Sequence, residues 1–192
     1  MNWAPKFLSE FITNPNAVGA VASSSNSLRH RMLEWIDWKN ANVIIEYGPG
    51  TGVFTDHILS CMRPGAKFFV IEINPVFAQM LRQRFPSLRV YQDSVARVQD
   101  ICKEEGVDQV DAVISGLPWA LITGKSQNIY LDATLEVLSP QGQFVTFAYL
   151  TGFLLPEAKR FKTKLHRRFS DVQKSQVSWL SLPPAFVYRC CR

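Results

Sequence analysis

Short apolar runs of the kind found in buried strands alternate along the chain with longer segments whose apolar residues recur at helical spacing. Strands are expected at residues 42–48, 67–73, 88–92, 110–115 and 143–150, with helices between them at 53–62, 76–85, 95–105 and 126–138. Strands that alternate with helices favour a parallel sheet covered on both faces. The pattern therefore predicts an α/β fold with a doubly wound, mostly parallel sheet of Rossmann-like type.

The two ends of the chain depart from this alternation. A basic helix is expected after Pro156, and two β-like runs follow at 172–180 and 185–191 with no helix between them. These runs predict an antiparallel hairpin at one edge, which completes a seven-stranded sheet. Two helices are expected before the first strand, so we expect an N-terminal helical segment at 1–40 beside an α/β domain at 41–192, together forming one structural domain.

Composition narrows the class of protein. The chain has 192 residues, of which 47% are hydrophobic and 19% charged, so it can bury a substantial core. The four cysteines show no C-x-x-C spacing and the histidines are scattered, which argues against a metal site and favours reduced thiols in the cytoplasm. No apolar run approaches the roughly 18 residues that a membrane span needs. A net charge of +5 weakly favours anionic partners.

A glycine-rich stretch, "EYGPGTG", lies directly after the first expected strand and opens a helix. Gly48, Gly50 and Gly52 allow a tight turn and a close approach of the backbone to a ligand. Their G-x-G-x-G spacing differs from the dinucleotide fingerprint, which would require glycine at Val53, and no lysine follows as in a phosphate-binding P-loop. The loop therefore suits a nucleoside whose linker carries no phosphate.

Acidic residues end the neighbouring strands. Glu72 lies where an acidic side chain accepts hydrogen bonds from ribose hydroxyls, about 20 residues beyond the glycines. Asp93, followed by Ser94, ends the third strand and is suited to accept a hydrogen bond from an adenine amine. Glu46, just before the glycines, is suited to receive a ligand ammonium group. Together these features, in this order, resemble the class I methyltransferases that use S-adenosylmethionine.

That resemblance implies a cofactor and a set of contacts for it. The methyl donor would be S-adenosylmethionine, which leaves as S-adenosylhomocysteine. The implied cofactor residues are Ser24, Glu46, Gly48, Gly50, Gly52, Glu72, Ile73, Asp93, Ser94 and Ser115.

The fourth strand ends in "ISGLPW", with a tryptophan that is expected at the surface. Adenine-amine methyltransferases carry Asn or Asp, an apolar residue, Pro and an aromatic residue at this position. This chain keeps the Leu117 carbonyl and the Trp119 ring but has Ser115 and Gly116 where the amide side chain would be. A serine cannot reproduce the contacts of asparagine, which puts methylation of a nucleic-acid base in doubt.

A wider resemblance covers residues from about Pro15 to Arg189. "NPNAVGAVASSSNSL", "IEYGPGTGVFT", "VIEINPVFAQML", "SGLPW", "GQFVTFAYL" and "LPPAFVYR" are similar to the bacterial phospholipid N-methyltransferase family, a relative of the rRNA adenine dimethylases. Members of that family methylate phosphatidylethanolamine. The resemblance implies an acceptor site shaped by Ser115, Leu117, Trp119 and Tyr149, with Ser23 and Ser24 closing over it. One departure is Ala22, where the family often has proline.

Two segments suggest how such an enzyme would meet a membrane. Six of the ten residues from Lys159 to Arg168 are Lys or Arg, and residues 3–13 place Trp3, Phe7 and other apolar residues on one helical face. The basic helix is either a solvated face or a surface for anionic lipid or RNA phosphates. The N-terminal helix either packs on the protein or lies in a membrane interface. The combination favours a cytoplasmic enzyme that associates peripherally with the membrane.

Two alternative functions remain open. The first is an rRNA adenine dimethylase, which Ser115 disfavours. The second is a catalytically silent protein that binds the cofactor and serves as an adaptor for nucleic acid or membrane, which the intact glycines and acids disfavour.

Overall fold

The computed structural model describes residues 27–152, 154–181 and 183–192. Its strands are β1 (Val43–Tyr47), β2 (Lys67–Ile71), β3 (Arg89–Tyr91), β4 (Val110–Ser115), β5 (Leu138–Tyr149), β6 (Asp171–Lys174) and β7 (Ala185–Cys191). Its labelled helices are α3 (Val53–Cys61), α4 (Pro75–Arg84), α5 (Val98–Glu104), α6 (Gly124–Val137) and α7 (Pro156–Arg168), with short 3₁₀ turns η2 (Val95–Arg97), η3 (Trp119–Leu121) and η4 (Leu150–Gly152). A further helical segment covers residues 27–33.

The strands form one seven-stranded sheet in the order β3-β2-β1-β4-β5-β7-β6. The first five are parallel, β7 is antiparallel to β5, and β6 is antiparallel to β7. The predicted doubly wound α/β fold with an antiparallel C-terminal pair is thus confirmed. The strand order reverses between β1 and β4, and ligands of such sheets bind outside the carboxyl ends of the strands at this point.

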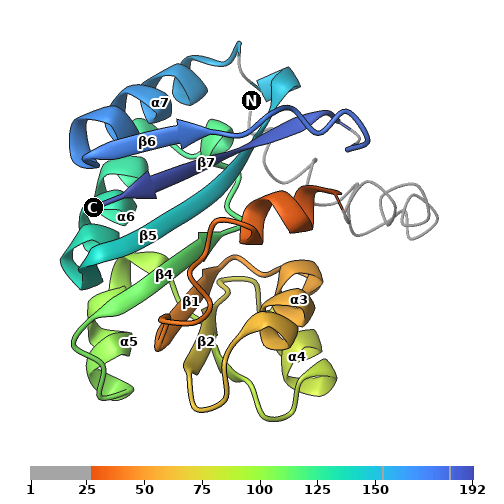
Figure 1. Ribbon diagram of the computed structural model, residues 1–192, viewed down its shortest axis with the longest axis vertical. Helices are drawn as coiled ribbons and strands as arrows, with labels where there is room; N and C mark the ends of the chain where they lie inside the picture. Colours follow the sequence, from red (N-terminus) through yellow and green to blue (C-terminus); the bar gives the residue numbers. More distant parts are fainter. Residues whose placement is uncertain (1–26, 153, 182) are drawn as a thin grey trace.

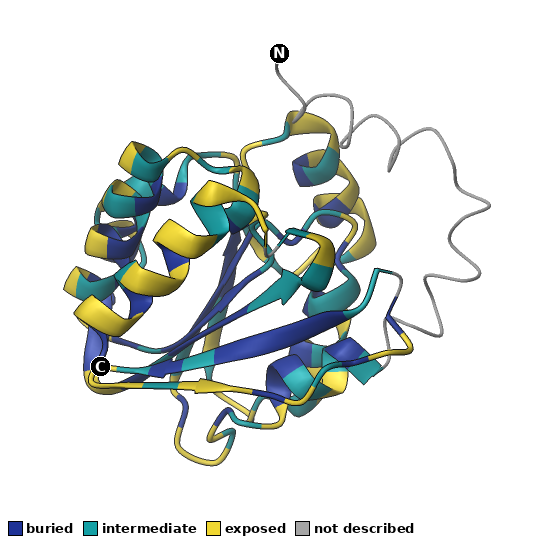
Figure 2. Cartoon of the chain, turned by 90° about the horizontal axis from the view of Figure 1, so that it is seen from above, coloured by how far each residue is buried: buried dark blue, intermediate teal, exposed yellow. Residues whose placement is uncertain are grey.

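Helices cover both faces of the sheet. Figure 1 shows α5, α6 and α7 on one face, and α3, α4 and the 27–33 segment on the other. Alternate residues of the central strands enter the two cores, as Ile45 and Val113 do on the first face and Ile44 and Ile114 on the second. The outer surfaces of the helices are exposed, whereas the central strands between them are buried (Figure 2). The central strands are therefore mostly apolar because both of their faces are buried, with polar exceptions such as Glu46 and Ser115 near their carboxyl ends.

Local sequence accounts for several element boundaries. The Asn74 side chain accepts hydrogen bonds from the backbone amides of Val76 and Phe77, and Pro75 occupies the first helical position of α4. This is the expected combination of a side-chain cap and a proline that needs no amide partner. It starts α4 directly after β2, so the Glu72 side chain lies at the carboxyl edge of the sheet.

Three elements differ from the sequence expectation. β5 begins at Leu138, directly after α6, and the predicted loop at 139–143 belongs to the strand, with a register irregularity opposite Val110 and Ala112. β6 ends at Lys174, because Ser175 and Ser178 hydrogen-bond across to Val187 and Ala185 in a turn. The second predicted helix ends at residue 33 and gives way to turns. In β5 and β6, pairing with neighbouring strands overrides the local pattern.

Candidate methyltransferase site

The glycine loop between β1 and α3 has the geometry of a ligand cradle. Gly48, Gly50 and Gly52 all have positive φ angles, of 61°, 57° and 82°. Side chains other than glycine rarely adopt this conformation. A Cβ added at Gly50 would meet no atom within 4 Å, so this part of the loop faces open space. The glycines therefore bend the chain, and they leave the backbone accessible at the sheet edge.

Glu72 connects the glycine loop to the start of α4. This buried carboxylate accepts one hydrogen bond from the Gly50 amide at 3.1 Å and another from the Asn74 amide at 2.8 Å. A carboxylate offers about four acceptor positions, so two remain for ligand hydroxyls. The structure thus places Glu72 at the loop, as a ribose contact requires.

Glu46 is a buried carboxyl with a free oxygen. Thr55 Oγ1 donates to its Oε2 atom at 2.6 Å, whereas Oε1 has no partner among the described residues. Desolvation by burial raises the pKa of Glu46 to about 8, against the opposing hydrogen bond from Thr55 and with a further increase from the negative charge of Glu72. A buried acceptor without a donor is costly. A cationic ligand group would relieve that cost, so the site fits a cofactor with an ammonium or sulfonium group.

The end of β3 completes the donor side. Asp93 accepts from the Ser94 amide at 2.7 Å and pairs with Arg97 at 2.9 Å, and Ser94 caps η2 through its hydroxyl. Ile73 follows Glu72 and is 67% exposed, which leaves an apolar surface beside the acid. The adenine contact expected of Asp93 stays a prediction, because its carboxylate is already engaged with Arg97.

The acceptor turn after β4 packs directly against the glycine loop. The Gly116 amide donates to the Tyr47 carbonyl at 2.8 Å. A Cβ on Gly116 would lie 2.6 Å from the Gly48 carbonyl oxygen, and a Cβ on Gly48 would lie 2.8 Å from the Leu117 side chain. Only glycines allow this approach. The turn that carries the acceptor residues is therefore held at the donor loop by backbone contact.

Trp119 lies in the core, so the expectation of an exposed tryptophan is wrong. It is 3% exposed, stacks on Phe161 with ring centroids 4.5 Å apart, and meets Phe144 edge-on. Its indole Nε1 donates to the buried Ser115 hydroxyl at 3.1 Å. The local sequence could not show this burial because the stacking partner comes from α7. Ser115 consequently acts first as an anchor for Trp119.

An apolar cavity of about 220 Å³ adjoins the turn. Its walls include Leu117, Trp119 and Tyr149 of the predicted set, together with Leu155 and Tyr188. Burial raises the pKa of Tyr149, which also meets Phe147 edge-on. The sequence analysis missed Leu155 and Tyr188 as wall residues, although Tyr188 lies in the "PPAFVYR" segment that it singled out. Three of the four predicted acceptor residues therefore line one cavity, whereas Ser115 is buried behind Trp119 and does not reach it.

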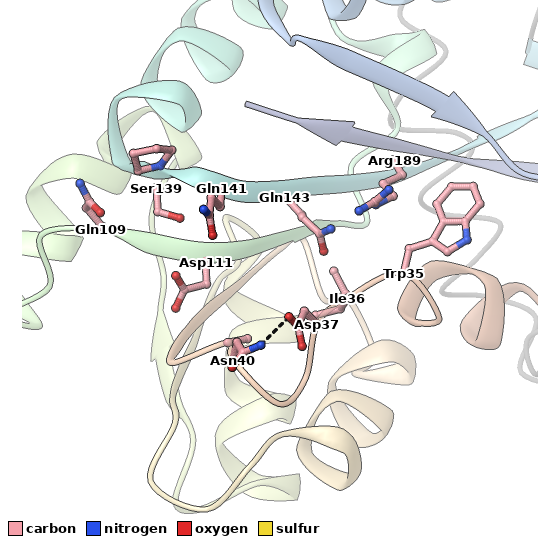
Figure 3. A pocket seen from close by; sticks show the side chains of 12 residues that line it. Trp35, Ile36, Asp37, Asn40, Gln109, Asp111, Ser139, Gln141, Gln143 and Arg189 are labelled. Atoms are coloured by element: carbon pink, nitrogen blue, oxygen red, sulfur yellow. Dashed lines mark hydrogen bonds between the residues drawn. The ribbon is translucent and has the colours of Figure 1, made fainter.

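A larger cavity of about 590 Å³ lies at the opposite edge of the sheet, at the amino ends of β1, β4 and β5. Figure 3 shows its polar lining, which includes Asp37, Gln143 and Arg189. None of the described residues predicted for the site lies there. The volume of a cavity alone therefore does not identify the catalytic edge of the sheet.

Parts of the prediction concern residues that the structure does not describe. Ser23, Ser24 and the helix expected at 3–13 all lie outside the described residues. Within the described ranges, no helix has both the length and the apolar character to span a bilayer.

Known proteins share this fold and this sequence pattern. The structure superposes on the O-methyltransferase TomG of Streptomyces achromogenes in complex with SAM, with a TM-score of 0.64 over 88% of this chain and 77% of that one at 16% identity. It also superposes on a methyltransferase of Streptococcus mutans in complex with SAH, with a TM-score of 0.65 over 88% of this chain and 98% of that one at 15% identity. Likeness at this identity shows the fold.

The sequence comparisons go further. The family model for ribosomal RNA adenine dimethylases matches residues 2–112. The chain is 32% identical to the ornithine lipid N-methyltransferase of Singulisphaera acidiphila over 187 residues, which is 96% of this chain and 93% of that protein. It is 27% identical to the ribosomal RNA small subunit methyltransferase A of Thermotoga neapolitana over 56% of this chain and 38% of that protein.

Fold, site and comparisons together define a class I methyltransferase that uses S-adenosylmethionine. Within this class, the chain belongs to the ribosomal RNA adenine dimethylase family. The two similar enzymes named above differ in acceptor, since one is named for a lipid and the other for RNA. The identity of the acceptor therefore depends on the acceptor side of the site.

Proposed function

We propose that this enzyme methylates the primary amine of a phosphatidylethanolamine-type lipid from the cytoplasmic surface of a membrane. The observation that carries the proposal is the composition of the acceptor cavity. Its lining is apolar and aromatic, with no Lys, Arg, Asp or Glu among the described residues that form it. An RNA substrate brings a phosphate on every nucleotide, and such a row of phosphates calls for several cationic partners, whereas a phosphatidylethanolamine headgroup carries a single phosphate. A lipid brings hydrocarbon that this lining accommodates.

The residues of the turn suit an amine acceptor. S-adenosylmethionine supplies a methyl group on a sulfonium centre, which an amine lone pair displaces in line. The Leu117 carbonyl already accepts from the Trp119 amide at 2.9 Å and keeps a second lone pair for an amine N–H. The backbone contact between Gly116 and Gly48 keeps that carbonyl beside the donor loop. Fixed alignment of two reactants is the main contribution that a protein makes to such a displacement.

The cavity also favours the reactive form of the amine. Only a neutral amine has the lone pair that attacks, and desolvation lowers the pKa of an amine because it disfavours the charged form. The apolar lining supplies this desolvation without a dedicated base. The rings of Tyr149 and Tyr188 then face a product that becomes permanently cationic, which cation–π attraction suits.

A second acceptor is favoured by a specific observation. The relative from Singulisphaera acidiphila, which matches nearly the whole chain, is named as an ornithine lipid N-methyltransferase. An ornithine lipid and phosphatidylethanolamine share a primary amine on a short chain near an anionic group. The apolar cavity accommodates either, so the choice between them is a matter for direct assay.

Methyl transfer from labelled S-adenosylmethionine tests the proposal. The purified protein is incubated in parallel with phosphatidylethanolamine vesicles, ornithine lipid vesicles and undermethylated ribosomal subunits. We expect label in extractable lipid, and most of it in phosphatidylethanolamine. Label confined to ornithine lipid would show that ornithine lipid, and not phosphatidylethanolamine, is the substrate. Label confined to RNA would refute lipid methylation. Cofactor binding without any label would favour the silent adaptor. The Glu72→Ala variant, which should lose the cofactor, is the control for background label.

A further inference from the structure

Two exposed apolar turns lie near the end of β5 and the start of β7, and of their four large apolar residues only Leu155 is among the cavity residues described above. The first holds Leu154 and Leu155 just before α7, and Leu154 is 79% exposed. The second holds Trp179 and Leu180 between β6 and β7, and these two are 71% and 75% exposed. Large apolar side chains with such exposure mark interaction surfaces when they gather in one region.

Both turns leave the sheet at the same place. Tyr149 at the end of β5 pairs with Ala185 at the start of β7, and the Leu150 amide donates to the Pro184 carbonyl at 2.9 Å. The chain beyond Leu150 and the chain before Pro184 therefore start side by side at the carboxyl edge. Leu155, Thr151 and Gly152 also line the acceptor cavity, so the first turn forms part of its rim.

The second turn presents its side chains from an ordered base. Ser178 Oγ donates to Ser27 Oγ at 2.9 Å and accepts from Ser181 Oγ at 2.9 Å, and both Ser178 and Ser181 are buried. The Ser178 amide donates to the Ala185 carbonyl at 2.7 Å. Serine hydrogen bonds on both sides hold the turn while Trp179 and Leu180 point outward. These hydrogen bonds therefore hold the turn in a conformation that exposes both side chains.

Cations lie next to the first turn. Lys159 and Lys162 follow Leu155 at spacings of four and seven residues, which places the three on one side of α7. Both lysines are exposed and form no ion pair with another described residue, unlike Arg160, which pairs with Glu157 at 2.5 Å. Apolar side chains with lysines beside them match the interface of a bilayer that contains anionic lipid, where tryptophan is also favoured.

We propose that Leu154, Leu155, Trp179 and Leu180 form a docking surface that inserts into a bilayer containing anionic phospholipid. We call these four residues the two-turn surface. The inference rests on the proposed function, because it explains how a lipid headgroup enters the cavity without leaving the membrane. In the docked state the cavity rim at Leu155 meets the lipid, and Lys159 and Lys162 meet anionic headgroups.

Vesicle flotation with the full chain tests the surface. We compare vesicles of phosphatidylethanolamine with phosphatidylglycerol against vesicles of phosphatidylcholine alone. The variant with Trp179→Ser and Leu180→Ser, and separately Leu154→Ser, should each lower binding to the anionic vesicles by roughly tenfold or more, because each removes apolar area that enters the bilayer. The matched control is Ile129→Ser on α6, whose side chain is 45% exposed, and it should bind as the parent does.

A second measurement separates this inference from the proposed function. Methyl transfer to short-chain phosphatidylethanolamine, kept below its micelle concentration, needs no docking, so the turn variants should retain parent rates there and lose them on vesicles. Unchanged vesicle binding by the turn variants would refute membrane docking through the two-turn surface, even if lipid is methylated. If gel filtration finds the parent chain dimeric and the turn variants monomeric, with unchanged vesicle binding, the four residues contact a second copy of this chain and the proposed docking is refuted. If no lipid is methylated but vesicle binding still depends on the turns, the proposed function fails and the surface stands.

Discussion

In the donor half of the catalytic edge, at the ends of β1, β2 and β3, the groups that we expect to hold the cofactor are backbone amides and carboxylates, of which Glu46 and Glu72 are buried. In the acceptor half, at the ends of β4, β5 and β7, aromatic rings and aliphatic side chains surround an apolar cavity. The family model for rRNA adenine dimethylases ends at residue 112, so it covers the donor half and stops before the acceptor turn. We therefore expect members of this family to share the donor half and to differ in the acceptor half.

The sharpest test of the donor half is Glu72→Ala. The variant loses the side chain that joins the glycine loop to α4 and that we expect to hold the ribose. Two charge-assisted hydrogen bonds at about 1.5–3 kcal/mol each predict a loss of cofactor affinity of roughly 100-fold or more, measurable by calorimetry. The exposed acid Glu104 provides the control, and Glu104→Ala should bind normally. Parent affinity in Glu72→Ala would show that the ribose is held elsewhere.

The contact between the two halves is tested by Gly116→Ala. The new Cβ would lie 2.6 Å from the Gly48 carbonyl oxygen, which forces the turn away from the glycine loop. We expect a loss of about 1–3 kcal/mol in the free energy of unfolding, typical of overpacking, and a kcat that falls more than cofactor affinity does. Denaturant unfolding and steady-state kinetics measure these effects.

The control for this variant is Gly65→Ala, where a Cβ would meet no atom within 4 Å but where φ is positive, at 83°, unlike at Gly116. It should suffer the backbone strain without the clash. Equal kcat values in the two variants would show that the approach of the halves does not govern the reaction.

Glu46 predicts a pH dependence that belongs to the donor half alone. Its pKa of about 8 means that the carboxyl is mostly protonated at lower pH, whereas a cation binds the ionised form. Binding must then release a proton, so cofactor affinity should rise by more than about tenfold between pH 6 and pH 7.5. Glu46→Gln should bind more weakly at pH 7.5 and lose most of this slope. A parent-like slope in the variant would assign the proton to another group.

The same raised pKa affects stability in the absence of cofactor, with a definite sign. The folded protein holds the Glu46 proton up to a pKa of about 8, whereas an ordinary glutamate loses it near 4.5. The stabilisation by the protonated form is therefore complete below pH 4.5 and is lost as the pH rises toward 8. Glu46→Gln should remove this part of the pH dependence of thermal unfolding.

In the acceptor half, Ser115→Ala separates anchoring from catalysis. The change leaves the indole Nε1 of Trp119 without its 3.1 Å acceptor in the core. We expect the free energy of unfolding to fall by about 1–3 kcal/mol, which is the usual cost of leaving a buried hydrogen-bond donor without an acceptor. Cofactor affinity, measured by calorimetry, should change little. A large loss of cofactor affinity would mean that Ser115 contacts the donor, as the sequence resemblance implied.

The smallest effect is expected for Tyr149→Phe. The Tyr149 hydroxyl forms no hydrogen bond to another described residue, and the Tyr149 ring lines the acceptor cavity. The phenylalanine keeps the ring, so KM for lipid should change by less than about threefold, whereas Tyr149→Ala should raise it by roughly tenfold if cation–π attraction contributes. Equal KM values for the two variants would remove Tyr149 from the acceptor site.

The donor half was the more predictable one because its signals are local. Each of these signals consists of residues that are close together in the sequence: closely spaced glycines, an acid at the end of a strand, and an Asn-Pro pair at the start of a helix. The acceptor half depends on residues far apart in the chain. The burial of Trp119 requires Phe161, and the cavity requires Leu155 and Tyr188 from two later segments. The longer β5 follows from the pairing of Leu138 with Val110 of β4, and the shorter β6 from a turn that hydrogen-bonds to β7. Local periodicity reports neither contact.

The contact between Gly48 and Gly116 has a practical consequence for redesign of the enzyme. It is made by backbone atoms, so it does not depend on which side chains line the acceptor cavity. Under the proposed function, substitutions in the cavity wall would change which amine is accepted, while the two glycines keep the turn at the donor loop. The wall is the part to vary for a new substrate, and the two glycines are the part to leave alone.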